Sequence, residues 1–291
     1  MPDAFQRLSH RQRSLVAEWL PGAVVEADLG WGLVETTVLA VSARGERFVV
    51  KAGGPSDRSV AREIDAHRNW LGPWTAIGRA PALVHHDAGA KLLVTEYLPG
   101  TLVLDTPHAA QPGIYRQAGE LLAAFHAQTA VVDDRHEQQE NERVLAWLDR
   151  PHRISPTTAH RIRAMIERWP TPPAVLVPTH GDWHTRNWLV DGGTLSIIDF
   201  DRVALRPAAT DVARLAGNEF RRYPGTEGHS SRGTAATPGT RGVVPAAGAR
   251  GGEYRRVGVP GRRRGLRGTR PPDDRRAAGR APGLTSRGAV R

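Results

Sequence analysis

The sequence predicts an α+β or α/β protein over its first 224 residues, followed by a tail of different character. Strand-like and helix-like segments alternate up to that point, with ordinary turn residues between them. With 291 residues, of which 40% are hydrophobic, the chain can build one large domain or two lobes. All eight tryptophans precede residue 190, so we expect the core in the first part of the chain.

Composition excludes several classes of protein. The chain has no cysteine, which excludes a disulfide scaffold, a thiolate zinc site and a cysteine nucleophile. This composition fits a reducing cytoplasm, and we expect a cytoplasmic protein. No apolar run reaches the roughly 18 residues of a membrane span, and the start is polar rather than secretory. We therefore expect no membrane partner.

The formal charge of +10 comes from residues 225–291. Residues 1–224 contain 25 basic and 26 acidic residues, whereas the tail contains 15 basic and 4 acidic ones. The tail also contains 15 glycines and 6 prolines, and its only aromatic residue is Tyr254. Such a segment cannot bury enough apolar surface to offset its ordering entropy. We predict an Arg/Gly/Pro-rich disordered tail.

Three explanations of this tail are open: a nucleic-acid-binding arm, a natural disordered tail and a frameshift product. Nucleic-acid-binding arms usually interleave aromatic residues for stacking, and this one nearly lacks them, so we expect no nucleic-acid partner. Out-of-frame reading of GC-rich DNA yields Arg, Gly, Pro and Ala. A shift by one nucleotide lets residues 261–266 encode Val-Gly-Asp-Glu-Ala-Phe. This favours the frameshift.

The first part of the chain contains recognisable strands and helices. "RFVVKA" at residues 47–52 is typical of a strand. Strand-like segments precede it at 33–41 and around Gly30 and Gly32. "KLLVTEYLPG" at residues 91–100 predicts a strand that runs into a turn. Helical spacing predicts one helix over about 57–71 and another over 114–128. The second helix has its core side at Ile114, Ala118, Leu121, Leu122 and Phe125.

Lys51 and Glu63 form a candidate ion pair. Lys51 ends a predicted strand and is one of only two lysines among 40 basic residues, which indicates a need for a compact ammonium. Glu63 falls on the apolar stripe of the predicted 57–71 helix, and a buried carboxylate requires a cation. Taken alone, Lys51 would be a solvated strand end and Glu63 a surface residue at the edge of the stripe.

A hairpin near residue 190 gathers polar side chains. "AVLVPT" at 174–179 predicts a strand, and the next two strands, "NWLV" and "TLSIIDF", are joined by Gly192-Gly193. A two-residue loop places Asn187 opposite Ile198 and beside Asp199, about 5 to 8 Å away. Amide and carboxylate oxygens suit Mg²⁺. Asp182 lies five residues upstream, in the adjoining loop.

The motif that contains these residues resembles a known family. "HGDWHTRN" at residues 180–187, followed by "IDFD" at 198–201, has the spacing of the phosphoryl-transfer template of protein kinases. Over residues 23–220 the sequence is similar to the aminoglycoside phosphotransferase and choline kinase-like family. The resemblance implies a two-lobed protein kinase-like fold. Residues 1–98 would be a nucleotide-binding, antiparallel-sheet N-lobe, and residues 99–224 an incomplete, mainly helical C-lobe.

The resemblance also implies roles for individual residues. Asp182 would be catalytic, with Asn187 and Asp199 holding Mg²⁺. Lys51 would bind the α and β phosphates of ATP or GTP, and Glu63 would hold Lys51 in place.

Further residues match the family's pattern less specifically. The backbone of Glu96 and Leu98 would bind adenine at the hinge. Asp211 matches an aspartate that braces the catalytic loop, with an ordinary N-cap as the alternative. We expect His180 to brace the same loop. Asp201, where protein kinases have glycine, is a second metal contact or a turn residue.

The predicted function is ATP-dependent transfer of a γ-phosphoryl group to a hydroxyl of a small molecule, which the sequence does not identify. The alternative is a nucleotide-binding relic or pseudokinase with a truncated acceptor pocket. Nucleic-acid binding through the tail is a third hypothesis. A metal-dependent hydrolase built on His180, Asp182 and His184 is a weaker one, because it leaves Lys51 and Glu63 unexplained.

Overall fold

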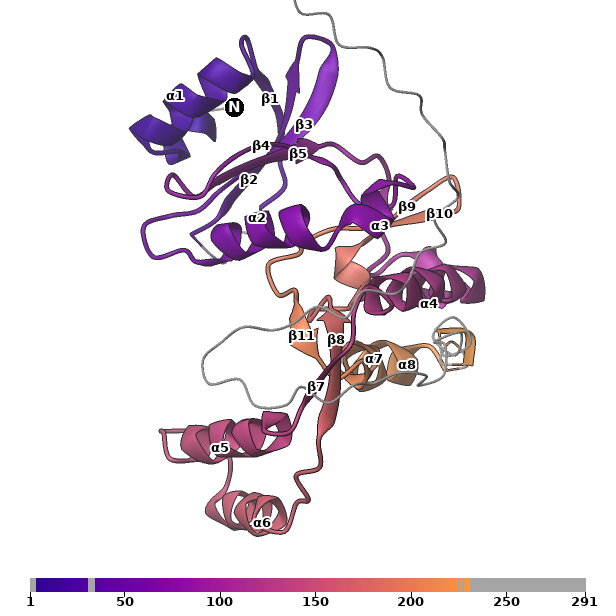
Figure 1. The fold of residues 1–291 in the computed structure, drawn as a ribbon. Coiled ribbons are helices and arrows are strands. Elements are labelled where there is room, and N and C mark those ends of the chain that lie inside the picture. The colour runs from indigo at the N-terminus through magenta and orange to yellow at the C-terminus, as the bar shows by residue number, and fades with distance from the viewer. Residues whose placement is uncertain (1–3, 31–34, 225, 227, 231–291) are drawn as a thin grey trace, which may run out of the picture. The chain divides into compact units, whose positions relative to one another are not determined.

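The computed structural model describes residues 4–30, 35–224, 226 and 228–230, which Figure 1 shows as a ribbon. The first part contains one antiparallel sheet with strand order β1-β2-β3-β5-β4. Its elements are η1 (Ala4–Arg7), α1 (His10–Trp19), β1 (Val24–Asp28), β2 (Thr37–Ala43), β3 (Glu46–Ala52), α2 (Ser59–Asn69), α3 (Gly72–Thr75), β4 (Leu83–Asp87) and β5 (Leu92–Glu96).

The second part is mainly helical and carries two small three-stranded sheets, β10-β9-β6 and β11-β8-β7. Its elements are β6 (Thr101–Leu102), η2 (Pro107–Ala110), α4 (Pro112–His126), β7 (Val131–Asp133), α5 (His136–Leu148), α6 (Pro156–Ile166), β8 (Ala174–Thr179), η3 (Thr185–Asn187), β9 (Trp188–Asp191), β10 (Thr194–Ile197), β11 (Ala204–Arg206), α7 (Ala209–Gly217) and α8 (Glu219–Arg222). This architecture confirms the predicted α+β class.

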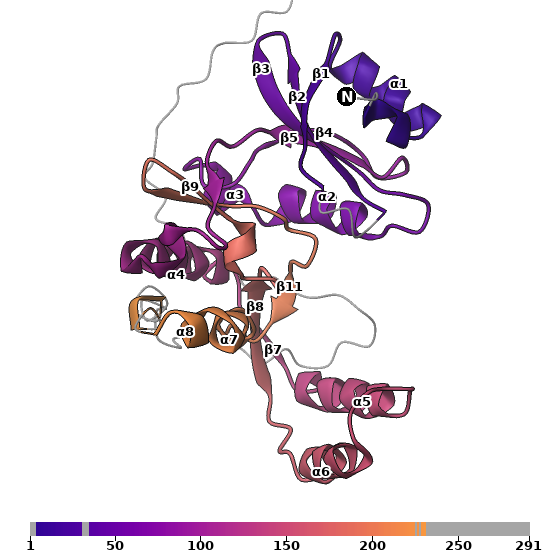
Figure 2. The same ribbon diagram turned by 180° about the vertical axis from the view of Figure 1, so that it is seen from behind.

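Two helices cover opposite faces of the five-stranded sheet (Figures 1 and 2). Val16 of α1 packs with Val50 of β3 on one face, whereas Ile64 of α2 packs with Leu93 of β5 on the other. Successive strand residues point to opposite faces, and Lys51 pairs with Leu93 across β3 and β5. The side chain of Lys51 therefore lies on the face that α2 covers.

The two helices predicted by apolar spacing are present. In α4, all five residues of the predicted stripe are buried, which confirms its core role. The helix predicted over about 57–71 is shorter in the structure, where α2 spans Ser59–Asn69. The Asp57 carboxylate accepts hydrogen bonds from the N–H groups of Ser59 and Val60 and so lies just before the helix.

The β9–β10 hairpin has the predicted register. Asp191 pairs with Thr194, and the N–H of Ile198 donates to the carbonyl of Asn187 at 3.0 Å. Both loop glycines have positive φ, 52° at Gly192 and 80° at Gly193, as a tight hairpin turn of this kind requires.

At the open end of this hairpin the strands stop short of the predicted bounds: β9 starts at Trp188 and β10 ends at Ile197. Asn187 ends the short helix η3 instead of starting a strand, because His184 Nδ1 accepts the N–H of Arg186 and closes a turn there. Asp199 lies beyond β10 with φ of 66°, a left-handed conformation that a strand cannot continue through. Both changes affect residues of the predicted site: Asn187 lies in a helical turn and Asp199 has a left-handed backbone. Unusual backbone conformations of this kind often occur at functional sites.

An aromatic core supports the second part of the chain. Trp74 is fully buried, stacks on Phe125 at 4.3 Å between ring centroids, and lies 5.8 Å from Trp183. Its indole nitrogen donates to the carbonyl of Leu121 at 2.8 Å. Phe200 packs in the same cluster, 6.0 Å from Trp74. Trp183 and Phe200, one from each half of the polar motif, are thus anchored in one core.

Some predictions fall on residues that the structure does not describe. The glycine-containing stretch at 30–32 is described only at Gly30, and the predicted disordered tail at 225–291 only at residues 226 and 228–230. The boundary between residues 98 and 99 stays a prediction. Among the described helices, none combines the length and apolar character that a transmembrane span requires.

Candidate active site

Lys51 lies at the centre of a cluster of three charges, in which Lys51 and Glu63 are largely buried and Asp199 is partly exposed. Its Nζ is 2.5 Å from Glu63 Oε2 and 2.7 Å from Asp199 Oδ1. We call Lys51, Glu63 and Asp199 the lysine cluster. Burial by itself would lower the pKa of Lys51, but the charges of Glu63 and Asp199 outweigh it and raise that pKa. The lysine is therefore cationic at neutral pH.

The lysine cluster joins three elements from distant parts of the sequence. Lys51 comes from β3, Glu63 from α2, and Asp199 follows β10. The structure brings together the pair that the sequence predicted and adds Asp199, whose contact with Lys51 was not predicted. The backbone N–H of Phe200 donates to Glu63 at 3.4 Å, which links α2 to this segment a second time.

Asp211 braces the loop that contains Asp182. Its side chain is fully buried and accepts the N–H groups of His180 at 3.0 Å and Gly181 at 2.8 Å. His126 Nε2 is 3.0 Å from the same carboxylate. The N-cap of α7 is Ala208 instead. This is the bracing arrangement that the family resemblance implied for Asp211.

His180 holds the same loop from within. Its Nδ1 accepts the N–H of Asp182 at 3.3 Å, and its Nε2 lies 3.3 Å from the carbonyl of Ile198. An Nε2–H tautomer satisfies both contacts. The imidazole therefore ties the loop to the hairpin, as expected for a bracing residue.

Asp182 is buried and its carboxylate is approached by several donors. Asn187 Nδ2 donates to its carbonyl at 2.9 Å and to its Oδ2 at 3.2 Å, and Arg186 Nη2 donates to Oδ2 at 2.6 Å. Burial favours a higher pKa, but the hydrogen bond and charge of Arg186 prevail and hold the pKa of Asp182 below its usual range. The carboxylate is thus ionised at neutral pH.

Two further arginines approach Asp182, and sequence reasoning missed both. Arg214 Nη1 of α7 is 3.7 Å from Asp182 Oδ1, and Arg202 Nη1 is 4.0 Å from the same oxygen. We call Asp182, Arg186, Arg202 and Arg214 the arginine cluster. Helical spacing gives no signal for these contacts, because Asp182 lies in the loop before η3 and Arg214 comes from the distant α7.

The residues predicted to hold a divalent cation provide suitable oxygen atoms. Asn187 uses its amide nitrogen on Asp182, and its Oδ1 accepts no hydrogen bond from a described residue. Asp199 uses Oδ1 on Lys51 and has no such partner at Oδ2. Amide and carboxylate oxygens are the donors that Mg²⁺ prefers, so this set fits such an ion. Among the described residues, no group of three or more His, Asp or Glu side chains is arranged to hold a metal ion.

The predicted hinge has one free backbone donor. The N–H of Glu96 donates to the carbonyl of Ala82 at 3.0 Å, whereas the N–H of Leu98 donates to no described residue. The backbone N–H of Leu98 is therefore available to a ligand. The N–H of Glu96 is already used, so Glu96 can offer a ligand only its carbonyl.

Two other residues of the motif make structural contacts. Asp201 accepts a hydrogen bond from Arg62 Nη2 of α2 at 3.0 Å, and Arg62 Nε donates to its carbonyl at 2.8 Å. Asp201 thus ties the turn after Phe200 to α2, and sequence reasoning missed its partner. His184 Nε2 lies 3.3 Å from Glu219 Oε1, next to a hollow that also includes Arg221.

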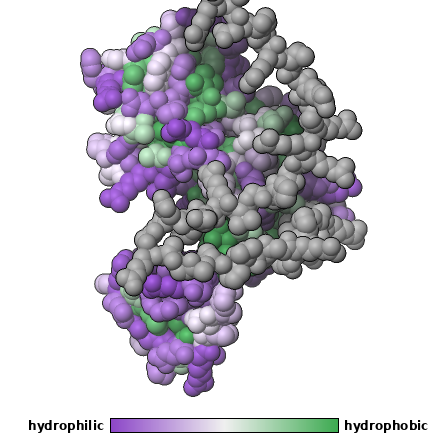
Figure 3. Space-filling model, viewed as in Figure 1, coloured by the Kyte–Doolittle hydropathy of each residue, from purple (hydrophilic) through white to green (hydrophobic). Residues whose placement is uncertain are grey.

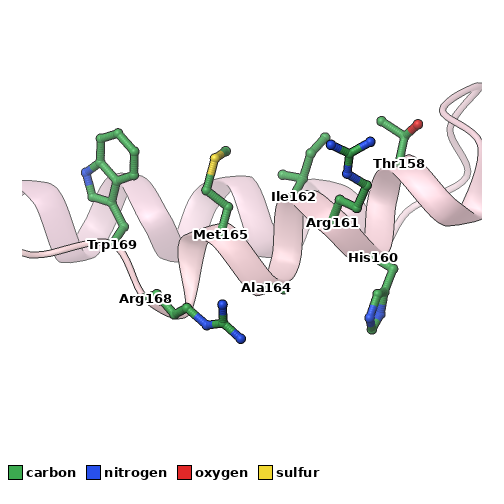
Figure 4. Close-up of a pocket in the computed structure, with 8 residues that line it drawn as sticks. All are labelled: Thr158, His160, Arg161, Ile162, Ala164, Met165, Arg168 and Trp169. Carbon is green, nitrogen blue, oxygen red and sulfur yellow. The ribbon is translucent and has the colours of Figure 1, made fainter.

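A second hollow lies elsewhere on the surface. It runs along α6 and the residues after it, and Figure 4 shows Met165 of α6 and Trp169, three residues beyond the helix, projecting to the same side. Figure 3 shows apolar surface in this region, where α5 exposes Val144 and Trp147. None of the residues that line this hollow belongs to the lysine or arginine cluster.

Comparison with known proteins identifies the family. The model of a family described as "Phosphotransferase enzyme family" matches residues 27–243. This range includes the whole predicted motif, and it starts and ends a little later than the expected resemblance over 23–220. The sequence has no significant match among curated proteins.

Solved structures share the fold at low sequence identity. A macrolide 2'-phosphotransferase from Brachybacterium faecium is 19% identical with a TM-score of 0.56, covering 78% of this chain and 83% of that one. A thermostable mutant of an aminoglycoside phosphotransferase, in ternary complex with ADP and hygromycin B, is 14% identical with a TM-score of 0.54 (77% and 81%). A choline/ethanolamine kinase family protein from Mesorhizobium loti is 20% identical with a TM-score of 0.53 (76% and 71%).

These likenesses confirm the two-lobed, kinase-like fold that the sequence predicted. The family match spans most of the chain, including all elements of the site from Lys51 to Asp211. The chain belongs to the phosphotransferase enzyme family.

Proposed function

We propose that this protein transfers the γ-phosphoryl group of ATP to a hydroxyl group of a small molecule. The observation that carries the proposal is the lysine cluster, in which β3, α2 and the segment after β10 bring Lys51, Glu63 and Asp199 within hydrogen-bond distance. Asp182 and Asn187 are joined on the neighbouring loop. Phosphoryl transfer depends mainly on positioning and charge neutralisation, and these residues can supply both.

In this proposal Lys51 binds the phosphates of the nucleotide. Its ammonium is cationic and held by Glu63, so it presents a compact positive charge without further reorganisation. Asn187 and Asp199 would hold Mg²⁺, which neutralises phosphate charge when bound. Leu98 would donate its free N–H to the adenine ring. The ADP complex of the similar aminoglycoside phosphotransferase supports ATP as the donor.

Asp182 acts on the acceptor. Its ionised carboxylate accepts a hydrogen bond from the attacking hydroxyl and aligns it with the γ-phosphorus. The oxygen of the hydroxyl forms the new bond to phosphorus, the bond to the β–γ bridging oxygen breaks, and ADP leaves. The hydroxyl proton passes to Asp182 and then to solvent. A carboxylate with a lowered pKa is a weak base, so orientation is its larger contribution.

A direct test uses the full chain with Mg·ATP and a panel of alcohols. Mass spectrometry is expected to find an alcohol that gains one phosphoryl group, with release of ADP. Asp182→Asn should lower turnover about a thousandfold while nucleotide binding, measured by titration calorimetry, stays unchanged. Asp191→Asn, at the exposed loop end of the same hairpin, is the matched control and should behave like the parent.

Two outcomes would contradict this proposal. Turnover of Asp182→Asn within tenfold of the parent would refute the role of Asp182. Binding of Mg·ATP without phosphorylation of any alcohol would favour the nucleotide-binding relic instead.

A further inference from the structure

Three guanidinium groups converge on the single carboxylate of Asp182. Arg186 lies at 2.6 Å, Arg214 at 3.7 Å and Arg202 at 4.0 Å, and the three come from η3, α7 and the turn after β10. Three positive charges against one negative charge leave a local excess of two positive charges. The excess lies where the proposed mechanism places the acceptor.

Two of these arginines have unused donors. A guanidinium carries five N–H donors. The side chains of Arg202 and Arg214 donate no hydrogen bond to any described residue. They are 46% and 44% exposed, so their donors are open to a ligand. Arg79 and Arg206, by contrast, donate to carbonyl groups and serve as structural links. Arg202 and Arg214 differ from them because protein contacts do not satisfy them.

Neighbouring acidic groups do not remove the positive excess. Asp201, whose Oδ1 is 4.0 Å from Arg202 Nε, already pairs with Arg62. Asp211 accepts two backbone N–H groups and contacts His126, and Glu219 lies beside His184. Among the described residues, therefore, no carboxylate other than Asp182 approaches Arg214 within 4.0 Å. Asp182 Oδ1, between the two arginines, also accepts no hydrogen bond.

The geometry points to an anionic alcohol as the acceptor, and this inference rests on the proposed function. Arg202 and Arg214 would bind its carboxylate or phosphate group, while Asp182 aligns a hydroxyl of the same molecule. Guanidinium groups match both anions in a two-pronged geometry and form charge-assisted hydrogen bonds with them. An acceptor with ammonium groups would meet repulsion from the positive excess instead.

Binding measurements on the full chain test the sign of the preferred charge. The probes are two sets of alcohols with matched skeletons: serinol, glycerol, glycerate and glycerol 3-phosphate, and glucamine, glucitol and gluconate. Titration calorimetry is done with Mg²⁺ and a non-hydrolysable ATP analogue present. We expect an anion of at least one set to bind about tenfold or more tightly than its neutral partner, and the cation to bind most weakly. Added salt should reduce the difference. Comparing glycerate with glycerol 3-phosphate separates carboxylate from phosphate recognition.

Variants then assign the preference to the two arginines. Arg202→Gln/Arg214→Gln should lose about tenfold in affinity for the preferred anion and little for the neutral partner, with nucleotide affinity retained. Arg163→Gln, an arginine of α6 that pairs with Asp149, is the matched control and should leave all affinities unchanged. Circular dichroism of each variant confirms that it is folded.

The outcomes separate this inference from the proposed function. Equal or tighter binding of the neutral or cationic probes in both sets overturns the inference, as does an anion preference that survives the double substitution. Phosphorylation of neutral or cationic alcohols without preference for an anion supports the proposed function and rejects an anionic acceptor. Anion binding that depends on the two arginines, without any phosphoryl transfer, supports the anion site and rejects the proposed function.

Discussion

The lysine cluster and the arginine cluster are neighbouring ion clusters built in opposite ways. In the lysine cluster, the cation is buried: the Lys51 side chain is 15% exposed and donates to both Glu63, which is 7% exposed, and Asp199, which is 39% exposed. In the arginine cluster, the three arginine side chains are 41% to 46% exposed, and two of them make no hydrogen bond within the described structure. The lysine cluster carries one excess negative charge and the arginine cluster two excess positive ones.

This difference separates what the fold needs from what a ligand can use. Breaking a buried ion pair leaves a desolvated charge without a partner, whereas an exposed charge stays hydrated when its partner is removed. We therefore expect substitutions in the buried contacts to lower both stability and activity. Substitutions of Arg202 and Arg214, which donate no hydrogen bond to a described residue, should change binding alone.

Asp211 belongs to neither cluster, but it is a fully buried carboxylate that braces the loop of Asp182. Its removal tests the expected cost of breaking buried contacts most severely. Asp211→Ala leaves the N–H groups of His180 and Gly181 and the ring of His126 without their acceptor. We expect the free energy of unfolding to fall by about 3 to 5 kcal/mol, measured by urea denaturation. Glu140→Ala, which breaks the exposed pair with Arg143 in α5, is the control and should change it by less than about 0.5 kcal/mol.

Lys51→Met tests the lysine cluster itself. It leaves Glu63, whose side chain is only 7% exposed, without its cation, so we expect stability to fall by about 3 kcal/mol and phosphate binding to be lost. Adding Glu63→Gln should restore most of the stability, because the buried charge is gone, but should not restore nucleotide binding. Arg202→Gln should leave stability within about 0.5 kcal/mol of the parent. A stable Lys51→Met protein that binds Mg·ATP normally would contradict the proposed role of Lys51.

The Lys51–Glu63 pair of the lysine cluster was predictable because each of the two residues breaks a local pattern. Lys51 stands at the end of an apolar strand in a chain with almost no other lysine, and Glu63 falls on an apolar helical stripe. The hairpin register followed from Gly192-Gly193, since a two-residue loop determines every pair that follows it. The sequence could not show that Lys51 also reaches Asp199, because that contact depends on how β3 meets the segment after β10.

The arginine cluster was not predictable, for a compositional and a topological reason. Arginine supplies nearly all of the 40 basic residues, so no single arginine stands out from its surroundings. Arg214 reaches Asp182 because α7 folds back onto the loop that contains Asp182, where Asp211 accepts the N–H groups of His180 and Gly181, and Arg202 reaches it from the turn after β10. Long-range packing of this kind leaves no periodic signal in the sequence.

His67 gives a smaller and pH-dependent test of the buried region. Its ring contacts Phe200 edge-on at 5.4 Å between centroids, and neither ring nitrogen has a hydrogen-bond partner. Burial, together with the positive charge of Lys51, lowers the pKa of His67 from 6.5 to about 4. Below pH 6.5 the unfolded chain binds a proton at this imidazole, but the folded protein does not until about pH 4. Stability is therefore lost as the pH falls through this window, by about 2 kcal/mol at pH 5 for this group.

Replacing the imidazole by a ring that cannot titrate should remove this loss. We expect urea denaturation of His67→Phe to show about 2 kcal/mol less destabilisation between pH 7 and pH 5 than the parent, because phenylalanine fills a similar space without binding a proton. Ile64→Val, on the same buried side of α2, is the control: it should lose about 1 kcal/mol at both pH values and keep the parent's pH dependence. If the curves of His67→Phe and the parent run parallel from pH 7 to pH 5, His67 is not kept neutral by its surroundings. The buried side of α2 would then be open to water, and the contrast between a closed lysine cluster and an open arginine cluster would lose its physical basis.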